Sequence, residues 1–269
     1  MMKQKIFGLI RISIPLLVLY GGICLVLAFL QRSMLYFPTP LTNTTAPFVE
    51  LQQEGATVRV SVYPNEGDRA VIYFGGNAED VSYSLAELTS VFPESAVYTM
   101  HYRGYSGSTG KPSELALHSD ARALYDHVKQ KHSEIIVVGR SLGSGLATPL
   151  SADNDVYRLV LITPFDSMVN VAKHHYPLLP VRLFLLDRYE SLHHAPKVKA
   201  PTLILIAESD QVVPSRLAVN LGNAFREGNC WSMVLPKTDH NSLTLPTLVV
   251  QQFIDNPKSL PASLMAGRR

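Results

Sequence analysis

The sequence has few cysteines, few charged residues and almost no charge imbalance. Two cysteines in 269 residues exclude a framework of several disulfides. Charged residues make up 17% of the chain, and the net charge of +2 provides no general attraction to nucleic acid, so we expect no nucleic-acid partner. No H-E-x-x-H or C-x-x-C motif occurs, and we expect neither a metal nor an organic cofactor. Apolar residues, at 46%, are plentiful enough for a large core and exclude wholesale disorder.

Acidic side chains are absent from the first 32 residues, and residues 12–30 carry no charge at all. Nineteen residues form a helix of about 28 Å, close to the roughly 30 Å of bilayer hydrocarbon. Two alternatives are a cleaved signal peptide and the buried helix of a soluble protein. A signal peptide has a shorter apolar run and ends in small residues, whereas this run ends Ala28-Phe29-Leu30. We therefore expect residues 1–32 to be an uncleaved, single-pass membrane anchor with its flanks.

The cations around this run predict its orientation. Lys3, Lys5 and Arg11 precede the run, and Arg32 alone follows it closely. Since positive charge favours the cytoplasmic side, we expect a cytoplasmic N-terminus and a periplasmic, lumenal or extracellular globular part. Asn43 opens an Asn-Thr-Thr glycosylation sequon on that far side, and only a eukaryotic secretory setting would use it.

The rest of the chain alternates between apolar runs and amphipathic segments. Residues 33–57 form a linker or first-strand region, and residues 58–269 form the predicted globular domain. Expected strands are 58–63, 70–74, 96–101, 134–138, 158–163, 202–207 and 230–235, and expected helices are 80–91, 114–132, 142–151, 215–227 and 243–254. This alternation predicts an α/β fold whose mostly parallel sheet is covered by helices on both faces. Residues 166–200 interrupt it and form either a cap over a site or an excursion of packing helices.

A G-x-S-x-G motif at residues 139–143 follows one expected strand and precedes a helix. A serine on such a strained turn is lifted clear of the sheet, and Gly139 and Gly143 avoid side-chain collisions with the turn. The turn also brings the N–H of Leu142 to the start of the helix, where it can donate to a developing oxyanion. Ser141 is therefore a candidate nucleophile, although a glycine-rich turn with an idle serine has the same sequence pattern.

A nucleophilic serine needs a base and an acid that orients the base. Asp210 and His240 follow two later expected strands, so both should reach the same sheet edge as Ser141. The order Ser-Asp-His along the chain is that of α/β-hydrolases. Asp166 also follows a strand and is a rival acid, whereas Asp239 is a poor rival because adjacent side chains diverge.

A second oxyanion donor is expected in the loop after the strand 70–74. Gly75 and Gly76 let the backbone approach a substrate, and the N–H of Asn77 is our candidate donor, with that of Gly76 as the alternative.

Together these motifs resemble the α/β-hydrolase superfamily, in particular its N-terminally anchored abhydrolase-domain serine hydrolases, which include relatives of protein depalmitoylases. The matching segments are residues 74–78, 102–105, 139–143, 210–214 and 240–241. The resemblance implies an α/β-hydrolase fold and the triad Ser141, Asp210 and His240. The family often has His-Gly-Asn where this chain has Gly75-Gly76-Asn77, so the hydrogen bonding of that loop must differ.

The expected function is membrane-anchored hydrolysis of a carboxylic ester or thioester, with lipid-borne esters among the candidate substrates, through an acyl-enzyme. A serine peptidase or amidase of the same fold is one alternative. A non-catalytic, membrane-tethered binding protein is another, although such proteins usually lose a triad member. The sequence leaves the physiological substrate and the oligomeric state open.

Overall fold

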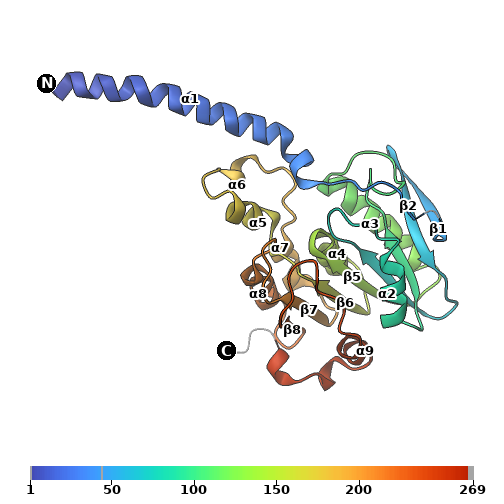
Figure 1. The fold of residues 1–269 in the computed structure, drawn as a ribbon. Coiled ribbons are helices and arrows are strands. Elements are labelled where there is room, and N and C mark those ends of the chain that lie inside the picture. Colours follow the sequence, from blue (N-terminus) through green and yellow to red (C-terminus); the bar gives the residue numbers. More distant parts are fainter. Residues whose placement is uncertain (1, 44, 266–269) are drawn as a thin grey trace.

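The computed structural model describes residues 2–43 and 45–265, with side chains from Ile14 onward. Thr44 of the Asn43 sequon lies outside the described residues. The described chain begins with a long helix, α1 (Met2–Leu35), and continues into a sheet packed between helices. Figure 1 shows α1 projecting from the rest of the molecule, with the N-terminal end of the chain farthest from the sheet.

Helix α1 is long and apolar enough to cross a membrane. Its segment Ile14–Leu35 has a mean hydropathy of 2.2, and only 6% of the apolar window lies buried in the fold. Large apolar side chains such as Leu17 and Val18 are exposed along it. This exposure excludes the helix of a soluble core, which would bury those side chains, and it suits membrane anchoring.

The described residues form an eight-stranded sheet with the order β1-β2-β4-β3-β5-β6-β7-β8. Its strands are β1 (Phe48–Gln53), β2 (Ala56–Tyr63), β3 (Arg69–Phe74), β4 (Ala96–Met100), β5 (Glu134–Arg140), β6 (Arg158–Ile162), β7 (Thr202–Ala207) and β8 (Cys230–Leu235). Strand β2 pairs antiparallel with β1 and β4, and all other pairs are parallel. The predicted mostly parallel sheet is therefore confirmed.

Helices cover the sheet on both faces. Along β3, alternate side chains enter different cores, with Ile72 in one and Val71 in the other. Helices α3 (Glu114–Val128), α4 (Ser144–Asp153) and α8 (Ser215–Ala224) pack on the first face, and α2 (Ser84–Val91) and α9 (Thr247–Asp255) on the second. This double cover explains why the strands are continuously apolar rather than alternating.

Two helices begin four residues later than the sequence pattern predicts. Helix α2 starts at Ser84 instead of residue 80, because the carboxylate of Asp80 accepts hydrogen bonds from the N–H and hydroxyl of Ser82 and holds a turn there. Helix α9 starts at Thr247 instead of residue 243, directly after Pro246.

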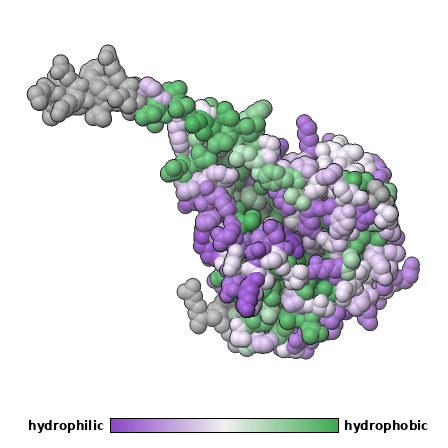
Figure 2. All heavy atoms as spheres, in the orientation of Figure 1, coloured by the Kyte–Doolittle hydropathy of each residue, from purple (hydrophilic) through white to green (hydrophobic). Residues whose placement is uncertain are grey.

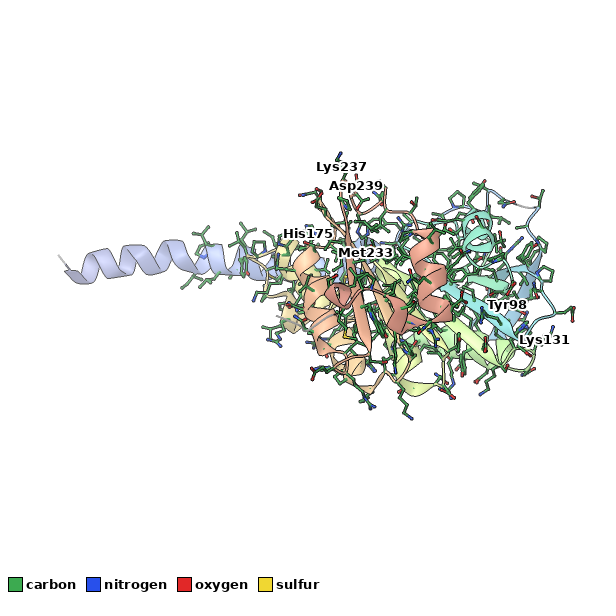
Figure 3. The ribbon with its side chains drawn as sticks, turned by 90° about the horizontal axis from the view of Figure 1, so that it is seen from below. Tyr98, Lys131, His175, Met233, Lys237 and Asp239 are labelled. Atoms are coloured by element: carbon green, nitrogen blue, oxygen red, sulfur yellow. The ribbon has the colours of Figure 1, made fainter. Side chains whose placement is uncertain are left out.

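Residues 166–200 connect β6 to β7 through three short helices, α5 (Met168–His175), α6 (Val181–Phe184) and α7 (Ser191–His194). Helices α5 and α6 lie on the side of the molecule from which α1 projects, whereas α7 lies nearer the sheet (Figure 1). Residues 168–187, which include α5 and α6, are called the cap segment below. In Figure 3, His175 of this segment lies at the α1 end of the globular part, and Tyr98 and Lys131 lie at the opposite end.

Candidate active site

The turn between β5 and α4 holds Ser141 in a strained conformation. Its φ is +49°, in the left-handed region that residues with a side chain rarely adopt. A Cβ at Gly143 would lie 2.0 Å from the carbonyl oxygen of Phe74, and one at Gly139 would lie 2.6 Å from the Cβ of Ala147. Both glycines are therefore required for the turn to pack this closely against β3 and α4.

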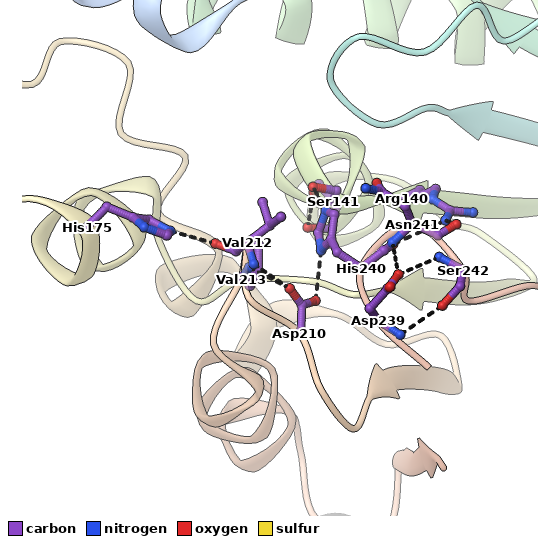
Figure 4. A network of polar contacts seen from close by, with 11 residues as sticks. Arg140, Ser141, His175, Asp210, Val212, Val213, Asp239, His240, Asn241 and Ser242 are labelled. Carbon is purple, nitrogen blue, oxygen red and sulfur yellow. Dashed lines mark hydrogen bonds and ion pairs between the residues drawn. The ribbon is translucent and has the colours of Figure 1, made fainter. Parts of the chain in front are cut away.

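Three side chains from separate loops form a continuous hydrogen-bonded relay at this turn (Figure 4). Nε2 of His240 lies 2.8 Å from Oγ of Ser141, and Nδ1 of His240 lies 2.7 Å from Oδ2 of Asp210. The loops follow β5, β7 and β8, whose carboxyl ends share one edge of the parallel sheet. The side chains of Asp210 and His240 are almost completely buried, so the relay is shielded from water.

The surroundings of Asp210 determine which nitrogen of His240 carries the proton. Oδ1 of Asp210 accepts the backbone N–H groups of Val212 and Val213 at 2.9 and 2.7 Å. Because an ionised carboxylate can only accept hydrogen bonds, the remaining contact is donated by Nδ1–H of His240. The other nitrogen, Nε2, is then an acceptor facing the hydroxyl of Ser141, as a general base must be.

The two other aspartates near this edge make different contacts. Asp166 is buried and accepts hydrogen bonds from the side chains of Ser167 and Asn170. Asp239 accepts the N–H groups of Asn241 and Ser242, and the hydrogen bond from Ser242 lowers the pKa of the Asp239 carboxyl. Asp210, unlike either of them, bonds His240 in the described part of the chain.

The loop after β3 is fixed by a carboxylate that the sequence reasoning missed. Oε2 of Glu79 accepts the N–H of Gly76 at 2.6 Å, while Oε1 accepts the hydroxyls of Tyr73 and Ser84. The N–H of Gly76, the alternative donor in the sequence hypothesis, is therefore already used. No hydrogen bond among the described residues uses the N–H of Asn77, which remains available for a ligand.

Two tyrosines of the segment 102–105 hold the same loop. Tyr102 donates its hydroxyl to the carbonyl of Gly75 at 2.7 Å, and Tyr105 donates to Oδ1 of Asn77 at 2.7 Å. Burial raises the pKa of the Tyr102 hydroxyl well above its usual value, so this side chain stays protonated and a donor. Asn77 also donates from Nδ2 to the carbonyl of Leu35 at 2.6 Å, which ties the loop to the end of α1.

An apolar pocket of about 430 Å³ lies beside Ser141. Its walls come from the last third of α1, the cap segment and the loop after β7. Ser141, Leu142 and Asn77 lie on its wall together, so the candidate nucleophile and both candidate oxyanion donors face the same space. Pockets of this size accommodate small-molecule ligands and are usually largely apolar, with a few convergent polar groups.

Comparison with known proteins identifies the family. An uncharacterised Mycobacterium tuberculosis protein is 33% identical over 238 residues, which cover 82% of this chain and 84% of that protein. The α/β hydrolase domain-containing protein aho-3 of Caenorhabditis elegans is 30% identical over 69% of this chain and 57% of its own length. The solved α/β hydrolase domain-containing protein 10 from mouse superposes with a TM-score of 0.63 at 17% identity, covering 80% of this chain and all of that one. No family model matches the chain.

The chain belongs to the α/β-hydrolase superfamily. A further relative, named lysophosphatidylserine lipase ABHD12 in Danio rerio, is 36% identical over 46% of this chain and 38% of its own length. The resemblance found from the sequence motifs is thus confirmed, as is the predicted fold class. By family the protein is a hydrolase.

The structure also shows what holds the 75–77 segment, which lacks the histidine often found there in this superfamily. The Glu79 carboxylate and the hydroxyl of Tyr102 bond the backbone of Gly76 and Gly75 directly. A glutamate directly after a Gly-Gly-Asn-Ala run was visible in the sequence, but nothing there showed that it folds back onto the glycine. Arg140 was missed in the same way, and it donates to the carbonyls of His240 and Asn241.

Proposed function

We propose that this protein is a membrane-anchored serine hydrolase that cleaves a carboxylic ester or thioester through an acyl-enzyme intermediate. Ser141 is the nucleophile, His240 the general base and acid, and Asp210 the group that orients His240. The observation that carries this proposal is the unbroken relay from Asp210 through His240 to Ser141, with contacts of 2.7 and 2.8 Å. Such contacts fit proton transfer without a rearrangement.

In the first half-reaction, Oγ of Ser141 attacks the acyl carbonyl while its proton passes to Nε2 of His240. The charge that develops on the carbonyl oxygen is stabilised by the N–H groups of Leu142 and Asn77. Collapse of the tetrahedral adduct breaks the bond to the leaving alcohol or thiol, which takes the proton from His240. In the second half, water loses a proton to Nε2 of His240 and attacks the acyl-enzyme. The bond between the acyl carbon and Oγ of Ser141 then breaks, Oγ takes the proton back from His240, and the carboxylic acid leaves.

The walls of the pocket support acyl esters or thioesters as the substrate class. Apart from Gln31, Asn77, Ser141 and His175, the residues that line it are hydrophobic. No Asp, Glu, Lys or Arg among the described residues lines the pocket to select a charged peptide side chain. Lipid hydrolysis by this chain is in keeping with the name of the relative from Danio rerio, a lysophosphatidylserine lipase. The amidase and peptidase alternative finds no comparable support in the described pocket.

We further propose that α1 stays attached, with its N-terminus in the cytoplasm and the hydrolase domain on the other side of the membrane. The side chain of Arg32 bonds the buried carboxylate of Asp187 at 2.9 and 3.2 Å, and Asn77 bonds the carbonyl of Leu35. Removing α1 would leave the carboxylate of Asp187 without this partner.

A protease test addresses the orientation. If the hydrolase domain lies on the far side of the membrane from the cytoplasm, protease added to sealed, right-side-out vesicles should degrade it. Protection of that domain would reverse the orientation.

A substrate panel tests the proposed reaction. The purified full-length protein in detergent is offered a p-nitrophenyl ester, an acyl thioester and a p-nitroanilide with the same short acyl group. We expect turnover of the ester and thioester, little of the anilide, and none of any substrate by Ser141→Ala. A preference for the anilide would favour an amidase, and failure of the wild type to turn over every substrate would contradict the proposal.

A further inference from the structure

One face of the membrane helix is turned toward the hydrolase domain. The pocket-lining residues Cys24, Leu27, Ala28, Gln31 and Leu35 follow one another at helical spacing, with Leu27 and Ala28 both about one turn from Cys24, so they share a single stripe of α1. Cys24 is 6% exposed, whereas its neighbour Leu25, on the other side of the helix, is 66% exposed. This stripe, in which Cys24 is buried and the other residues are partly buried, is thus part of the pocket beside Ser141, and the exposed side is left for lipid.

Polar contacts hold this stripe against the cap segment. The amide of Gln31 donates to the carbonyl of Phe184 at 3.1 Å and accepts the N–H of Leu186 at 2.7 Å. Nearer the N-terminus, the hydroxyl of Tyr20 donates to the carbonyl of Leu178 at 2.6 Å. The Gln31 contacts lie in the wall of the pocket and the Tyr20 contact lies beyond its Cys24 end, so α1 is a fixed wall of the pocket rather than a loose tether.

The pocket extends along α1 away from the candidate nucleophile. Leu35 lies next to the loop that carries Asn77, and Cys24 is eleven residues earlier in the same helix. At 1.5 Å per residue, the stripe from Leu35 to Cys24 is about 16 Å long. Small side chains at Cys24 and Ala28 leave room along this length, where a larger residue would fill the space between α1 and the cap segment.

The outer surface around the pocket is apolar as well. Leu178, Leu183 and Leu186 of the cap segment are exposed, as are the apolar side chains on the outer side of α1. Figure 2 shows hydrophobic residues gathered where α1 meets the globular part. Exposed leucines beside a membrane helix are stabilised when they enter the interfacial layer of the bilayer.

We propose that this pocket takes a single acyl chain of a membrane lipid, drawn from the bilayer beside α1, and that the α1 residues Ala28 and Cys24 limit the length of that chain. The inference rests on the proposed function, since the acyl carbonyl must reach Ser141. The chain then runs from Ser141 along the pocket-lining stripe of α1, between α1 and the cap segment. The membrane helix is in this way a determinant of substrate specificity, in addition to being an anchor.

Acyl-chain-length profiles test this inference. The full-length wild type and the variants Ala28→Trp, Cys24→Trp and Leu25→Trp are assayed with p-nitrophenyl esters of increasing chain length, from butyrate to palmitate. Leu25→Trp is the matched control, because it adds the same side chain to the outer side of the same helix. Ala28→Leu is a smaller second variant, used for the comparison if Ala28→Trp shows no butyrate hydrolysis.

We expect Ala28→Trp to lower kcat/KM for palmitate by about tenfold or more, the effect of withdrawing two or three methylenes from an apolar site. Butyrate hydrolysis should fall by a much smaller factor than palmitate hydrolysis, and Leu25→Trp should resemble the wild type throughout. Cys24→Trp, farther from Ser141, should affect only the longest esters.

Two results would overturn the inference. One is a chain-length profile of the position-28 variant that equals that of Leu25→Trp, and the other is a loss of the same size for butyrate and palmitate. Either result would leave the proposed hydrolase activity intact. A wild-type protein that hydrolyses no ester at all would instead contradict the proposed function.

Discussion

Gly143→Ala places a Cβ 2.0 Å from the carbonyl oxygen of Phe74 and 2.7 Å from that of Gly75. Ordinary van der Waals contact begins near 3.4 Å, so the turn and the end of β3 must separate by about 1.4 Å. That movement pulls Leu142 away from Asn77, the two residues whose N–H groups are to hold the oxyanion. A misplacement of about 1 Å can cost 10²-fold in rate. We therefore expect kcat/KM for a short ester to fall by about 100-fold or more.

The strain should also lower stability. Overpacking of this kind costs about 1–3 kcal/mol, which lowers the midpoint of thermal unfolding by roughly 3–10 °C in a chain of this size. Steady-state ester hydrolysis and thermal unfolding are measured on the same purified protein. Gly67→Ala is the control, because its Cβ would meet only the flexible side chain of Asn65 within 3.4 Å. If Gly143→Ala hydrolyses the ester at the rate of Gly67→Ala, the proposed oxyanion site is wrong.

Three further changes probe other parts of the site and fold. Asp210→Asn should lower kcat by about 10⁴-fold in ester hydrolysis, because an amide no longer selects the tautomer of His240 that accepts the serine proton. A loss below tenfold would exclude Asp210 as the orienting acid. Glu79→Ala should lower kcat by about 10- to 100-fold with little change in KM, because the N–H of Gly76 loses its hydrogen bond to the Glu79 carboxylate. An unchanged kcat would mean that the loop keeps its shape without this carboxylate. Burial lowers the pKa of His101 to about 4, whereas this side chain has a pKa of 6.5 when it is exposed in the unfolded chain. As the pH falls below 6.5, the unfolded chain is therefore protonated at His101 while the folded chain is not. For this group the free energy of unfolding should drop by about 3 kcal/mol between pH 7 and pH 4, as measured by denaturant titration. His101→Gln should lack this part of the pH dependence, and a variant with the same pH dependence as the wild type would contradict the assignment.

The regular part of the fold follows from local sequence. Strands β7 and β8 have the predicted bounds, because an uninterrupted apolar run between polar turns has few alternatives in a sheet covered on both faces. The meeting of Ser141 with His240 also follows from a general rule, since parallel strands end at one edge. The start of α2 does not, because the turn at Asp80 depends on a hydrogen bond between side chain and backbone.

Long-range packing is what the sequence could not give. The spacing of Cys24 and Ala28 marks one face of a helix, but only the folded chain shows that the cap segment covers it. The carboxylate of Glu79 likewise gains its place from the close approach of its own loop to Gly76. The first feature arises where segments distant in sequence come into contact, and the second where a turn folds the chain back on itself.

Covalent labelling of Ser141 tests the central claim most directly. The purified full-length protein is treated with a fluorophosphonate probe, and the modified residue is located by mass spectrometry of its peptides. We expect stoichiometric labelling on Ser141, none in Ser141→Ala, and much slower labelling when His240 is replaced by alanine. A wild-type chain that remains unlabelled, or equal labelling of Ser141→Ala, would contradict the account.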